Sequence, residues 1–580
     1  MSAALTAQEP SAKYLVNLQP PLVRHFDLIA QAPGGVARLR ELILTLAVQG
    51  KLVPQDPSDE PASELLKQIR AEKDRLIAEG KIKRDKPLAE IVDEEQPFEL
   101  PDGWQWVRLN ALLQKIGAGS TPLGGKEVYV SSGVKFLRSQ NVWDDGLRLS
   151  SVAYIRPETH AKMAGTVVLP NDLLFNITGA SIGRCALVPS DFDEANVSQH
   201  VTIVRTVLPV LNAFLHKVLV SRHVQQTVMD VQVGVSREGL SIAKLGNFLI
   251  PVPPLAEQSR IVTRVEELMQ LCDALEASGQ LQAQQHAQLA GTLLGTLTQS
   301  ETPEALADNW ERIATHFDVL LDRPEAVDAL EQTILQLAVR GLLVPQDPTD
   351  EPASVLLQKI RTEKDHLIAQ GKIKRDKPLP LITDEEKPFE LPLGWEWVRL
   401  GNLGITQTGG TPASSKSEYF NGNFPFIGPG QITPSGQILP AEKFVSELGA
   451  LESAVAELGD ILMVCIGGSI GKCAAATFPT AFNQQINSIH PLLSSSEYVL
   501  NAMSSMDFTQ AVLNAATGSA TPIISKGKWD LLLLPLPSQD EQERIVTRVN
   551  ELRALCVDLR QCLSAAQSTQ GHLADAMIAV

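Results

Sequence analysis

Five short polar segments hold the residues of this 580-residue chain best suited to bind a ligand, and each occurs twice. The first copies are residues 119–122, 136–141, 178–184, 199–200 and 235–237, and the second copies are 409–412, 426–431, 466–472, 484–485 and 520–522. Glycine-rich loops let backbone amides approach phosphates, and a following Arg or Lys adds positive charge. Arg, Asn and Gln side chains can form paired hydrogen bonds with base edges. These residue types therefore predict DNA binding.

We expect DNA contacts from a defined set of side chains in each copy. In the first copy these are Ser120, Thr121, Arg138, Ser139, Gln140, Asn141, Ser181, Arg184, Gln199, His200, Ser236 and Arg237. In the second copy they are Thr411, Gln431, Ser469, Lys472, Gln484, Gln485 and Thr521. A plainer interpretation stays open, because glycine-bearing turns need no ligand and polar loop residues often meet only water.

Motifs that would carry a reaction are missing from the sequence. There is no GxxxxGK[ST] phosphate loop, no GxGxxG fingerprint and no Asn-Pro-Pro-aromatic segment of the kind amino-methyltransferases use. The ten histidines form no HExxH spacing, and the six cysteines form no CxxC pair. We therefore predict no catalytic residues, no metal site and no cofactor in this chain.

The sequence of the elements that position these segments is duplicated. Residues 50–109 and 341–400 align without a gap at an offset of 291, and 46 of the 60 positions are identical. Such a duplication predicts a pseudo-twofold arrangement of two similar units. Two similar surfaces suit a two-sided partner, and duplex DNA is the obvious candidate.

One part of each unit has helical periodicity. Apolar residues recur at spacings of 4, 3, 4 and 3 from Ile261 to Leu275 and again from Ile545 to Leu559, which is typical of an a/d seam. A second seam runs from Val36 to Leu46, with its copy from Val327 to Leu337. These seams are compatible with a helical bundle core or with a long antiparallel pair that spaces two domains.

The other part of each unit, residues 98–255 and 390–538, carries short β-branched runs separated by Gly, Pro, Asn and Asp, which predicts strands. The expected fold class is α+β, with two strand-rich domains separated and flanked by long antiparallel, coiled-coil-like helices. The expected segments are a tail over 1–24, a helical repeat over 25–97, a strand-rich domain over 98–255, a helical spacer over 256–389, a second strand-rich domain over 390–538 and a final helix over 539–580.

Composition sets limits on location and on DNA affinity. The sequence has no apolar run long enough for a membrane span and no secretory signal, so we expect a cytoplasmic protein with reduced thiols. The net charge of −17 argues against a protein that binds nucleic acid without partner proteins. Residues 98–255 carry 14 Lys+Arg against 12 Asp+Glu, whereas residues 390–538 carry 6 against 11. The acidic excess therefore lies mostly on the helical parts.

The order of these parts resembles a known family. Each strand-rich domain opens with Leu-Pro-x-Gly-Trp-x-Trp, at 100–106 and 391–397. The first closes with PPLAEQ-x-RIV at 253–262, and the second with PLP at 535–537 followed by EQ-x-RIV at 541–546. This pattern looks like the DNA-specificity subunit of Type I restriction-modification systems.

The resemblance implies that each strand-rich part is a target recognition domain that reads half of a bipartite site in double-stranded DNA. The helices would space these domains and dock two modification (methyltransferase) subunits, and restriction subunits would join that core. S-adenosylmethionine, ATP and magnesium would belong to those partners. The partner-binding residues expected on the helices are Ile261, Val265, Leu268, Ile545, Val549 and Leu552. The 25–97 segment would pair with the helix around 539–575. The alternative is a duplicated helical adaptor that does not bind DNA.

Overall fold

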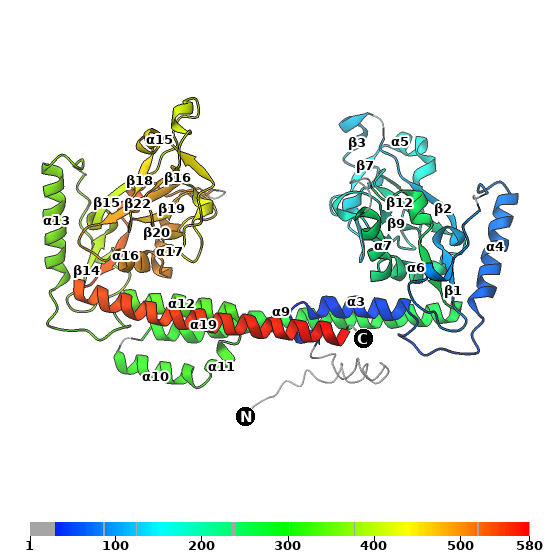
Figure 1. Ribbon diagram of the computed structural model, residues 1–580, viewed down its shortest axis with the longest axis horizontal. Coiled ribbons are helices and arrows are strands. Elements are labelled where there is room, and N and C mark those ends of the chain that lie inside the picture. The colour runs from blue at the N-terminus through cyan, green and yellow to red at the C-terminus, as the bar shows by residue number, and fades with distance from the viewer. Residues whose placement is uncertain are drawn as a thin grey trace. The chain divides into compact units, whose positions relative to one another are not determined.

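The computed structural model (Figure 1) describes residues 29–84, 87–122, 124–233, 239–300, 302–375, 377–518 and 521–578. The tail expected over 1–24 lies outside the described residues. The chain forms two compact units, one made of residues 1–281 and 567–580 and the other of residues 282–566. The boundary between them falls inside a helix, so the units cut across the six predicted segments. Each unit contains helices and a strand-rich part, which confirms the α+β prediction.

The first unit contains helices from several parts of the chain. They are α3 (Gly35–Val48), α4 (Ala62–Ala78), α5 (Pro157–Lys162), α6 (Asn212–Leu219), α7 (Arg222–Val233), α8 (Ile242–Gly246), the first part of α9 (Leu255–Thr298) and the last turns of α19 (Gln539–Ile578). Apolar residues of α3 face the core at helical spacing, with Leu39 and Ile43 fully buried. Gly50 follows α3 with a φ of 69°, a left-handed conformation that glycine accepts without strain.

The strands of the first unit form two larger sheets and two short pairs. They are β1 (Gln105–Arg108), β2 (Leu113–Ala118), β3 (Tyr129–Val130), β4 (Val134–Leu137), β5 (Val142–Trp143), β6 (Gly146–Leu147), β7 (Ala153–Ile155), β8 (Val167–Val168), β9 (Leu173–Asn176), β10 (Cys185–Leu187), β11 (Ala195–Val197), β12 (Val201–Thr206) and β13 (Leu249–Val252). The sheet orders are β10-β9-β12-β2 and β3-β7-β4-β11-β8, and the pairs are β1-β13 and β5-β6. In the larger sheets only β4 and β11 are parallel neighbours among the described strands.

The second unit repeats this plan. Its helices are the end of α9, α10 (Pro303–Ala314), α11 (Phe317–Leu320), α12 (Pro324–Val339), α13 (Ala353–Ala369), α14 (Leu400–Leu403), α15 (Glu447–Glu452), α16 (Ser496–Met503), α17 (Met506–Ala515), α18 (Lys526–Asp530) and most of α19. Its strands are β14 (Glu396–Arg399), β15 (Gly404–Thr408), β16 (Phe424–Ile427), β17 (Lys443–Val445), β18 (Ala454–Ala456), β19 (Ile461–Val464), β20 (Cys473–Ala475), β21 (Thr480–Phe482), β22 (Ile486–Pro491) and β23 (Leu533–Leu536).

The strands that the two units share lie in the same order, and the first unit adds β3 at the edge of its second sheet and the pair β5-β6. The second unit has sheets β15-β22-β19-β20 and β17-β16-β21-β18, with the pair β14-β23. Here too the parallel pair, β16 and β21, lies inside the second sheet. The duplication seen in the sequence therefore extends through the strand-rich parts, where few residues are shared.

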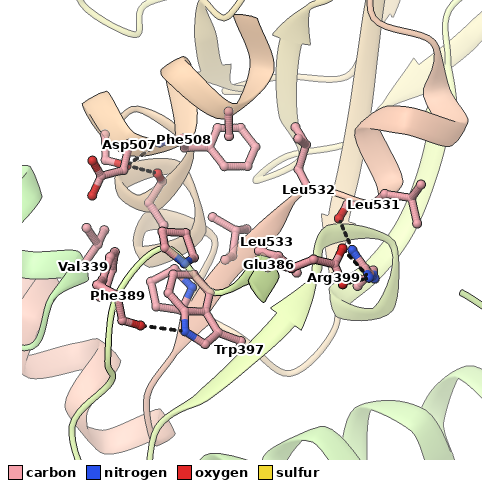
Figure 2. Close-up of a pocket in the computed structure, with 16 residues that line it drawn as sticks. Val339, Glu386, Phe389, Trp397, Arg399, Asp507, Phe508, Leu531, Leu532 and Leu533 are labelled. Atoms are coloured by element: carbon pink, nitrogen blue, oxygen red, sulfur yellow. Dashed lines mark hydrogen bonds and ion pairs between the residues drawn. The ribbon is translucent and has the colours of Figure 1, made fainter. Parts of the chain in front are cut away.

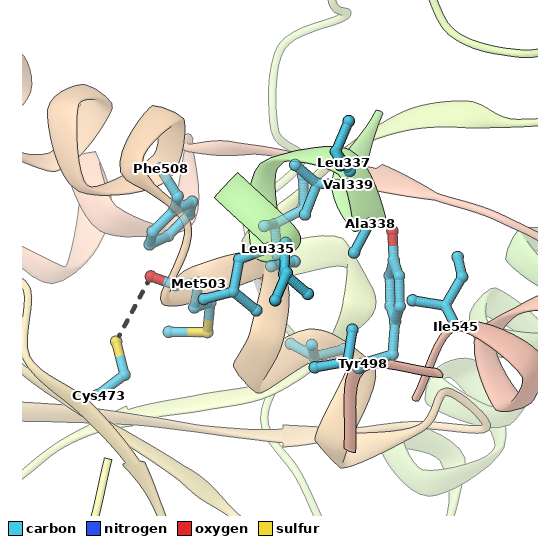
Figure 3. Close-up of a cluster of buried hydrophobic side chains, with 14 of the residues drawn as sticks. Leu335, Leu337, Ala338, Val339, Cys473, Tyr498, Met503, Phe508 and Ile545 are labelled. Carbon is cyan, nitrogen blue, oxygen red and sulfur yellow. Dashed lines mark hydrogen bonds between the residues drawn. The ribbon is translucent and has the colours of Figure 1, made fainter. Parts of the chain in front are cut away.

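Each hydrophobic core joins helices to sheets. Figure 3 shows this for the second unit, where Leu335 of α12 and Met503 of α16 belong to one cluster with Cys473 of β20, whose Sγ lies 3.8 Å from the Met503 carbonyl oxygen. The corresponding core of the first unit joins α3, α6 and α7 to strands β9 and β10. A separate apolar layer, which includes Leu137, Leu174 and Ile203, fills the space between the two sheets. None of the described helices is long and apolar enough to cross a bilayer.

A buried glutamate joins three repeated segments in each unit. In the first unit, Trp104 Nε1 donates to Glu257 Oε2 at 2.9 Å and Gln55 Nε2 donates to Glu257 Oε1 at 2.7 Å. Glu257 is 1% exposed, and burial raises the pKa of its carboxyl above the ordinary value. Arg260, one turn further along α9, pairs with Asp59 at 2.6 Å. We call this network the glutamate joint.

The second unit contains the same joint. Trp395 Nε1 donates to Glu541 Oε2 at 2.8 Å, and Gln346 Nε2 donates to Glu541 Oε1 at 2.5 Å. Arg544 pairs with Asp350 at 2.6 Å. The same residue types therefore form the same connection in both units. It links the LVPQDP segment, the Gly-Trp-x-Trp segment and the first turn of a long helix.

A second repeated connection surrounds a small pocket, shown for the second unit in Figure 2. Arg399 is 4% exposed, pairs with Glu386 at 2.9 Å and donates to the Leu531 carbonyl at 2.8 Å. Trp397 Nε1 donates to the Phe389 carbonyl at 3.2 Å. In the first unit, Arg108 pairs with Glu95 at 2.9 Å. These groups satisfy one another within the chain, so they hold the segment before each strand-rich part in place.

The charges beside the helix seams are reversed between the units. Arg40 of α3 pairs with Glu276 of α9 at 3.1 Å, and also with Asp273 at 2.6 Å. At the matching positions, Glu331 of α12 pairs with Arg560 of α19 at 2.9 Å. The apolar seams of the two units are identical in sequence, so they cannot distinguish one repeat from the other. Exchanged pairing would oppose Arg40 to Arg560 and Glu331 to Glu276, and like charges in contact are destabilising.

This reversal predicts a coupling that mutagenesis can measure. Arg40→Glu places three acidic groups together, and it should lower the free energy of unfolding by about 1 kcal/mol at low salt. Adding Glu276→Arg gives the first unit the polarity of the second and should recover part of the loss. A double-mutant cycle by chemical denaturation measures the coupling, with Arg70→Glu on the exposed face of α4 as the matched charge control. Strictly additive effects would show that the pair does not contribute.

Candidate nucleic-acid interface

The strand ends of the first unit bring four of its five predicted polar segments to one place. Ala118 at the end of β2 lies opposite Thr202 of β12, and Asn176 at the end of β9 lies opposite Val201. The parallel strands β4 and β11 end side by side, at Leu137 and Val197. The loops that follow must therefore meet at a common edge. We define the first loop edge as residues 119–122, 138–141, 177–184 and 198–200.

Hydrogen bonds tie these loops to one another. Ser120 N donates to the Val197 carbonyl at 3.1 Å, and Ser198 N donates to the Leu137 carbonyl at 2.9 Å. The Asn176 side-chain amide donates to the Ser139 carbonyl at 2.9 Å and to Ser181 Oγ at 3.2 Å. The loops therefore form one continuous polar surface.

Two exposed side-chain pairs lie on this surface. Thr178 Oγ1 and His200 Nδ1 are 2.6 Å apart, and Thr121 Oγ1 donates to Gln199 Oε1 at 3.3 Å. His200 and Gln199 are both exposed. These contacts hold donors and acceptors at fixed positions, which is what base-edge hydrogen bonding requires.

The second unit builds a matching edge from its own copies of these segments. Asn483 N donates to the Ile427 carbonyl at 3.1 Å, and Gly410 N donates to the Phe482 carbonyl at 3.0 Å. Thr411 Oγ1 donates to Gln484 Oε1 at 2.6 Å, as Thr121 does to Gln199. We define the second loop edge as residues 409–412, 428–431, 465–472 and 483–485.

A fifth predicted segment joins the second loop edge. Gly467 N donates to the Pro522 carbonyl at 2.9 Å, and Ile524 N donates to the Cys465 carbonyl at 3.0 Å, so exposed Thr521 lies beside the 465–472 loop. In the first unit, Leu240 N donates to the Ile177 carbonyl at 2.8 Å in the same way. Ser236 and Arg237 lie outside the described residues.

Most of the predicted contact residues are accessible. Exposed are Ser120, Thr121, Gln140, Gln199, His200, Thr411, Gln484 and Thr521. Half-buried are Arg138, Ser139, Ser181, Arg184, Gln431, Ser469, Lys472 and Gln485. Thr521 lies beside the second loop edge and the others belong to the loop edges; the contact of all of them with DNA stays a prediction.

Asn141 needs a correction. Its side chain is fully buried; Oδ1 accepts a hydrogen bond from Arg138 N at 3.0 Å, and Nδ2 donates to the Arg148 carbonyl at 2.9 Å. Both ends of the amide are therefore used inside the chain, and Asn141 cannot offer them to a base in this conformation. Gln431 accepts from Gly428 N at 3.0 Å in the second unit, so it supports its loop in a similar way.

Sequence reasoning missed a cluster beside the first loop edge. The guanidinium carbon of Arg148 lies 3.6 Å from the centre of the Trp143 ring, and that of Arg184 lies 3.7 Å from it. Trp143 ends β5 of a hairpin in which β5 pairs with β6, and Arg148 follows β6. The turn is Asp144-Asp145, and the Asp-Gly pair at 145–146 was a sequence signal for it. The cluster adds Arg148 to the predicted Arg184.

Comparison with known proteins agrees with this architecture. The model of the Type I restriction modification DNA specificity domain matches the chain twice, over residues 101–284 and 392–566. The chain belongs to this family. The specificity subunits of the Escherichia coli Type I restriction enzymes EcoAI and EcoEI are 38% and 36% identical to it, and each alignment covers 94% of this chain and 93% of the relative. A solved structure that addresses assembly and conformational transition of the type I restriction-modification system aligns with 83% of this chain and 98% of its own, at 19% identity and a TM-score of 0.46.

Membership settles the general function. The chain is a DNA-specificity subunit with two target recognition domains, and it is a non-catalytic component of a Type I restriction-modification enzyme. The predicted resemblance is confirmed, and the adaptor without a DNA role is set aside. In this specificity subunit, the two loop edges are the candidate surfaces for DNA.

The helix residues predicted to bind partner subunits pack within their own units. Ile261, Val265 and Leu268 lie in the core of the first unit, and Ile545 and Val549 lie in the core of the second. Their side chains are at most 1% exposed, and Leu552 is half-buried against the second core. A fully buried side chain cannot contact another protein, so docking by α9 and α19, which stays a prediction, must use their exposed faces.

The loop edges depend on a glycine that a larger residue cannot replace. A Cβ atom at Gly119 would lie 2.0 Å from the Val197 carbonyl oxygen, whereas one at Gly117 would meet nothing within 4 Å. Gly119→Ala should therefore displace the 119–122 loop, destabilise the protein by about 1–3 kcal/mol and weaken DNA binding by the assembled enzyme. Gly117→Ala is the matched control. Chemical denaturation and DNA-binding titrations measure both effects, and equal results for the two variants would argue against the close-packed edge.

Proposed function

We propose that each unit of this specificity subunit reads one half of a bipartite DNA site through its loop edge. The observation that carries the proposal is the use of one backbone frame with two sets of side chains. Gly119 and Gly409 both pack against the facing strand end, since a Cβ atom would lie 2.0 Å from the Val197 carbonyl oxygen in the first unit and 2.4 Å from the equivalent Phe482 oxygen in the second. Around that frame the first unit carries Arg138 and Arg184 where the second carries Gly428 and Lys472. Equivalent positions with different hydrogen-bonding groups are suited to different base sequences.

The edges differ in charge as well as in shape. Residues 98–255 have a small positive excess, whereas residues 390–538 have a negative one. Phosphate attraction supplies most non-specific DNA affinity, so a chain with a net charge of −17 should bind DNA weakly by itself. The first edge should bind better than the second at low salt.

The partners of this proposed reader follow from the Type I system to which the chain belongs. We propose that the exposed faces of the helical parts dock two modification (methyltransferase) subunits, which add positive charge around the duplex, and that restriction subunits complete the enzyme. S-adenosylmethionine, ATP and magnesium act in those subunits. The repeated glutamate joints support this arrangement, because each fixes a recognition domain to the start of a long helix.

Methylation in the host tests whether each unit reads its own half of the DNA site. Sequencing of methylated bases in a host that carries this chain and its modification subunit should reveal a split motif. The double variant Thr411→Ala and Gln484→Ala removes an exposed hydrogen-bonded pair from the second edge only. It should relax or change the bases of one half of the motif and leave the other half intact.

A double variant on α13 provides the matched control. Gln358→Ala with Thr362→Ala removes the same two residue types from the exposed face of α13, away from the strand ends, and should leave the motif unchanged. A continuous motif would contradict the proposal. So would a change in both halves from variants in one unit.

A further inference from the structure

The arginines at Trp143 form a stack rather than a cluster of independent charges. Each guanidinium carbon lies within 3.7 Å of the ring centre. Two guanidinium groups at such distances from one ring cannot share a face, because they would overlap. They therefore occupy opposite faces, and each is held against the ring by cation–π attraction and dispersion.

The stack is anchored to the first loop edge. Trp143 Nε1 donates to the Gln140 carbonyl at 2.9 Å, which fixes the ring beside the 138–141 loop. The carbonyl of Arg184 accepts from Asn176 N at 2.8 Å, which fixes that arginine at the end of β9. Arg148 Nη2 pairs with Asp145 Oδ2 at 3.3 Å, and the side chain remains accessible, since 53% of its surface is exposed. The two guanidinium groups are thus oriented before any ligand arrives.

A stacked guanidinium has one kind of contact left to make. Its faces are covered by the ring or open to solvent, whereas its N–H groups point outward in the plane of the group. An in-plane fork of donors fits an acceptor pair such as O6 and N7 of guanine, or two oxygens of a phosphate. Prior orientation reduces the entropy lost on binding, and it improves discrimination where direction matters.

The spacing of the two guanidinium groups fits the spacing of base pairs. The two distances to the ring add to 7.3 Å, which is the largest separation of the guanidinium carbons. Stacked base pairs are about 3.4 Å apart, so two steps span about 6.8 Å. Parallel arginines at this spacing match two base pairs with one pair between them, and the edge of Trp143 would face the middle pair.

The second unit lacks the stack. By position in the repeat, Thr433 replaces Trp143 and Lys472 replaces Arg184. Leu439 N donates to the Gln431 carbonyl at 2.8 Å, as Arg148 N does to Asn141 at 2.9 Å, so Leu439 replaces Arg148. Residues 390–538 contain one arginine, Arg399, and it is buried in the base of the unit. The two edges therefore differ in the residue type that reads guanine best.

We infer that Arg148 and Arg184, stacked on Trp143, read two guanines separated by one base pair in the half-site of the first unit. Both arginines are specificity-determining residues, and Trp143 is a positioning residue that holds them. The inference rests on the proposed function, and it adds the bases that one edge selects.

The test uses the assembled methyltransferase complex and the duplex site defined by methylation in the host. The half-site that changes with first-edge variants should contain two G·C pairs with one pair between them. Replacing either guanine with 7-deazaguanine, which lacks the N7 acceptor, should weaken binding of the wild-type complex by about tenfold or more. This measurement needs no variant, so it stands even where a variant fails to fold.

Variants then assign each guanine to one arginine. Arg148→Ala should make the complex indifferent to 7-deazaguanine at one position, and Arg184→Ala at the other. Trp143→Leu keeps both charges, so it should reduce discrimination while leaving the salt dependence of binding unchanged. Arg156→Ala is the matched control, because Arg156 is exposed and follows β7 at the opposite end of β4 from the loop edge.

Three results would overturn the inference. One is a first half-site without two G·C pairs at this spacing. Another is full affinity for duplexes that carry 7-deazaguanine. The third is an arginine variant that weakens binding equally for all sequences and lowers the salt dependence, which is the behaviour of a phosphate contact. In each of these cases a split motif would still support the proposed function, whereas the lack of any split motif would overturn the proposed function itself.

Discussion

The structure depends on a buried glutamate at the first turn of each long helix. Glu257 and Glu541 accept hydrogen bonds from a tryptophan of the recognition domain and from a glutamine of the preceding loop. A buried carboxylate that lost such a donor would be left unsatisfied, at a cost of about 1–3 kcal/mol or more. Both groups also have raised pKa values because burial disfavours their charge. The joint therefore explains why the amino-acid sequence around it is nearly the same in the two copies.

Outside the glutamate joint, the two units share a backbone frame but differ in side chains. The shared strands keep the same order, and Gly119 and Gly409 both pack closely against the facing strand end, so the common part of the backbone frame is held constant. The residues of the loop edges differ at 11 of their 19 aligned positions. A reader built in this way can change its target without changing its attachment. The reversed ion pairs of Arg40 and Arg560 add a second distinction, since they favour each helix seam within its own unit.

Much of this was predictable from sequence because it rests on periodicity and repetition. The helix seams, the strand-rich parts and the polar segments followed from local spacing, and their double occurrence indicated a common frame. That these segments meet at one edge required strand pairing, such as that of Leu137 with Val197, which local patterns do not specify. The same holds for the stack, since Arg184 is far from Trp143 along the chain.

The errors have physical causes of the same kind. Asn141 has the right chemistry for a base contact, yet its neighbours consume both ends of its amide. The seam residues Ile261 and Ile545 have the right periodicity for a helix interface, yet that interface is the core of their own unit. Residue type and spacing identify a surface that can bind. Only packing shows which side chains remain available.

The central claim is that the two loop edges, and not the helices, contact the bases. Photo-crosslinking of the assembled complex to its methylation site, with a photoreactive base placed in each half in turn, tests it most directly. Peptides from 119–122, 138–148, 177–184 and 198–200 should crosslink to one half, and peptides from 409–412, 428–431, 465–472 and 483–485 to the other. Crosslinks from both halves to a single unit, or crosslinks confined to α4, α9, α13 and α19, would contradict the account.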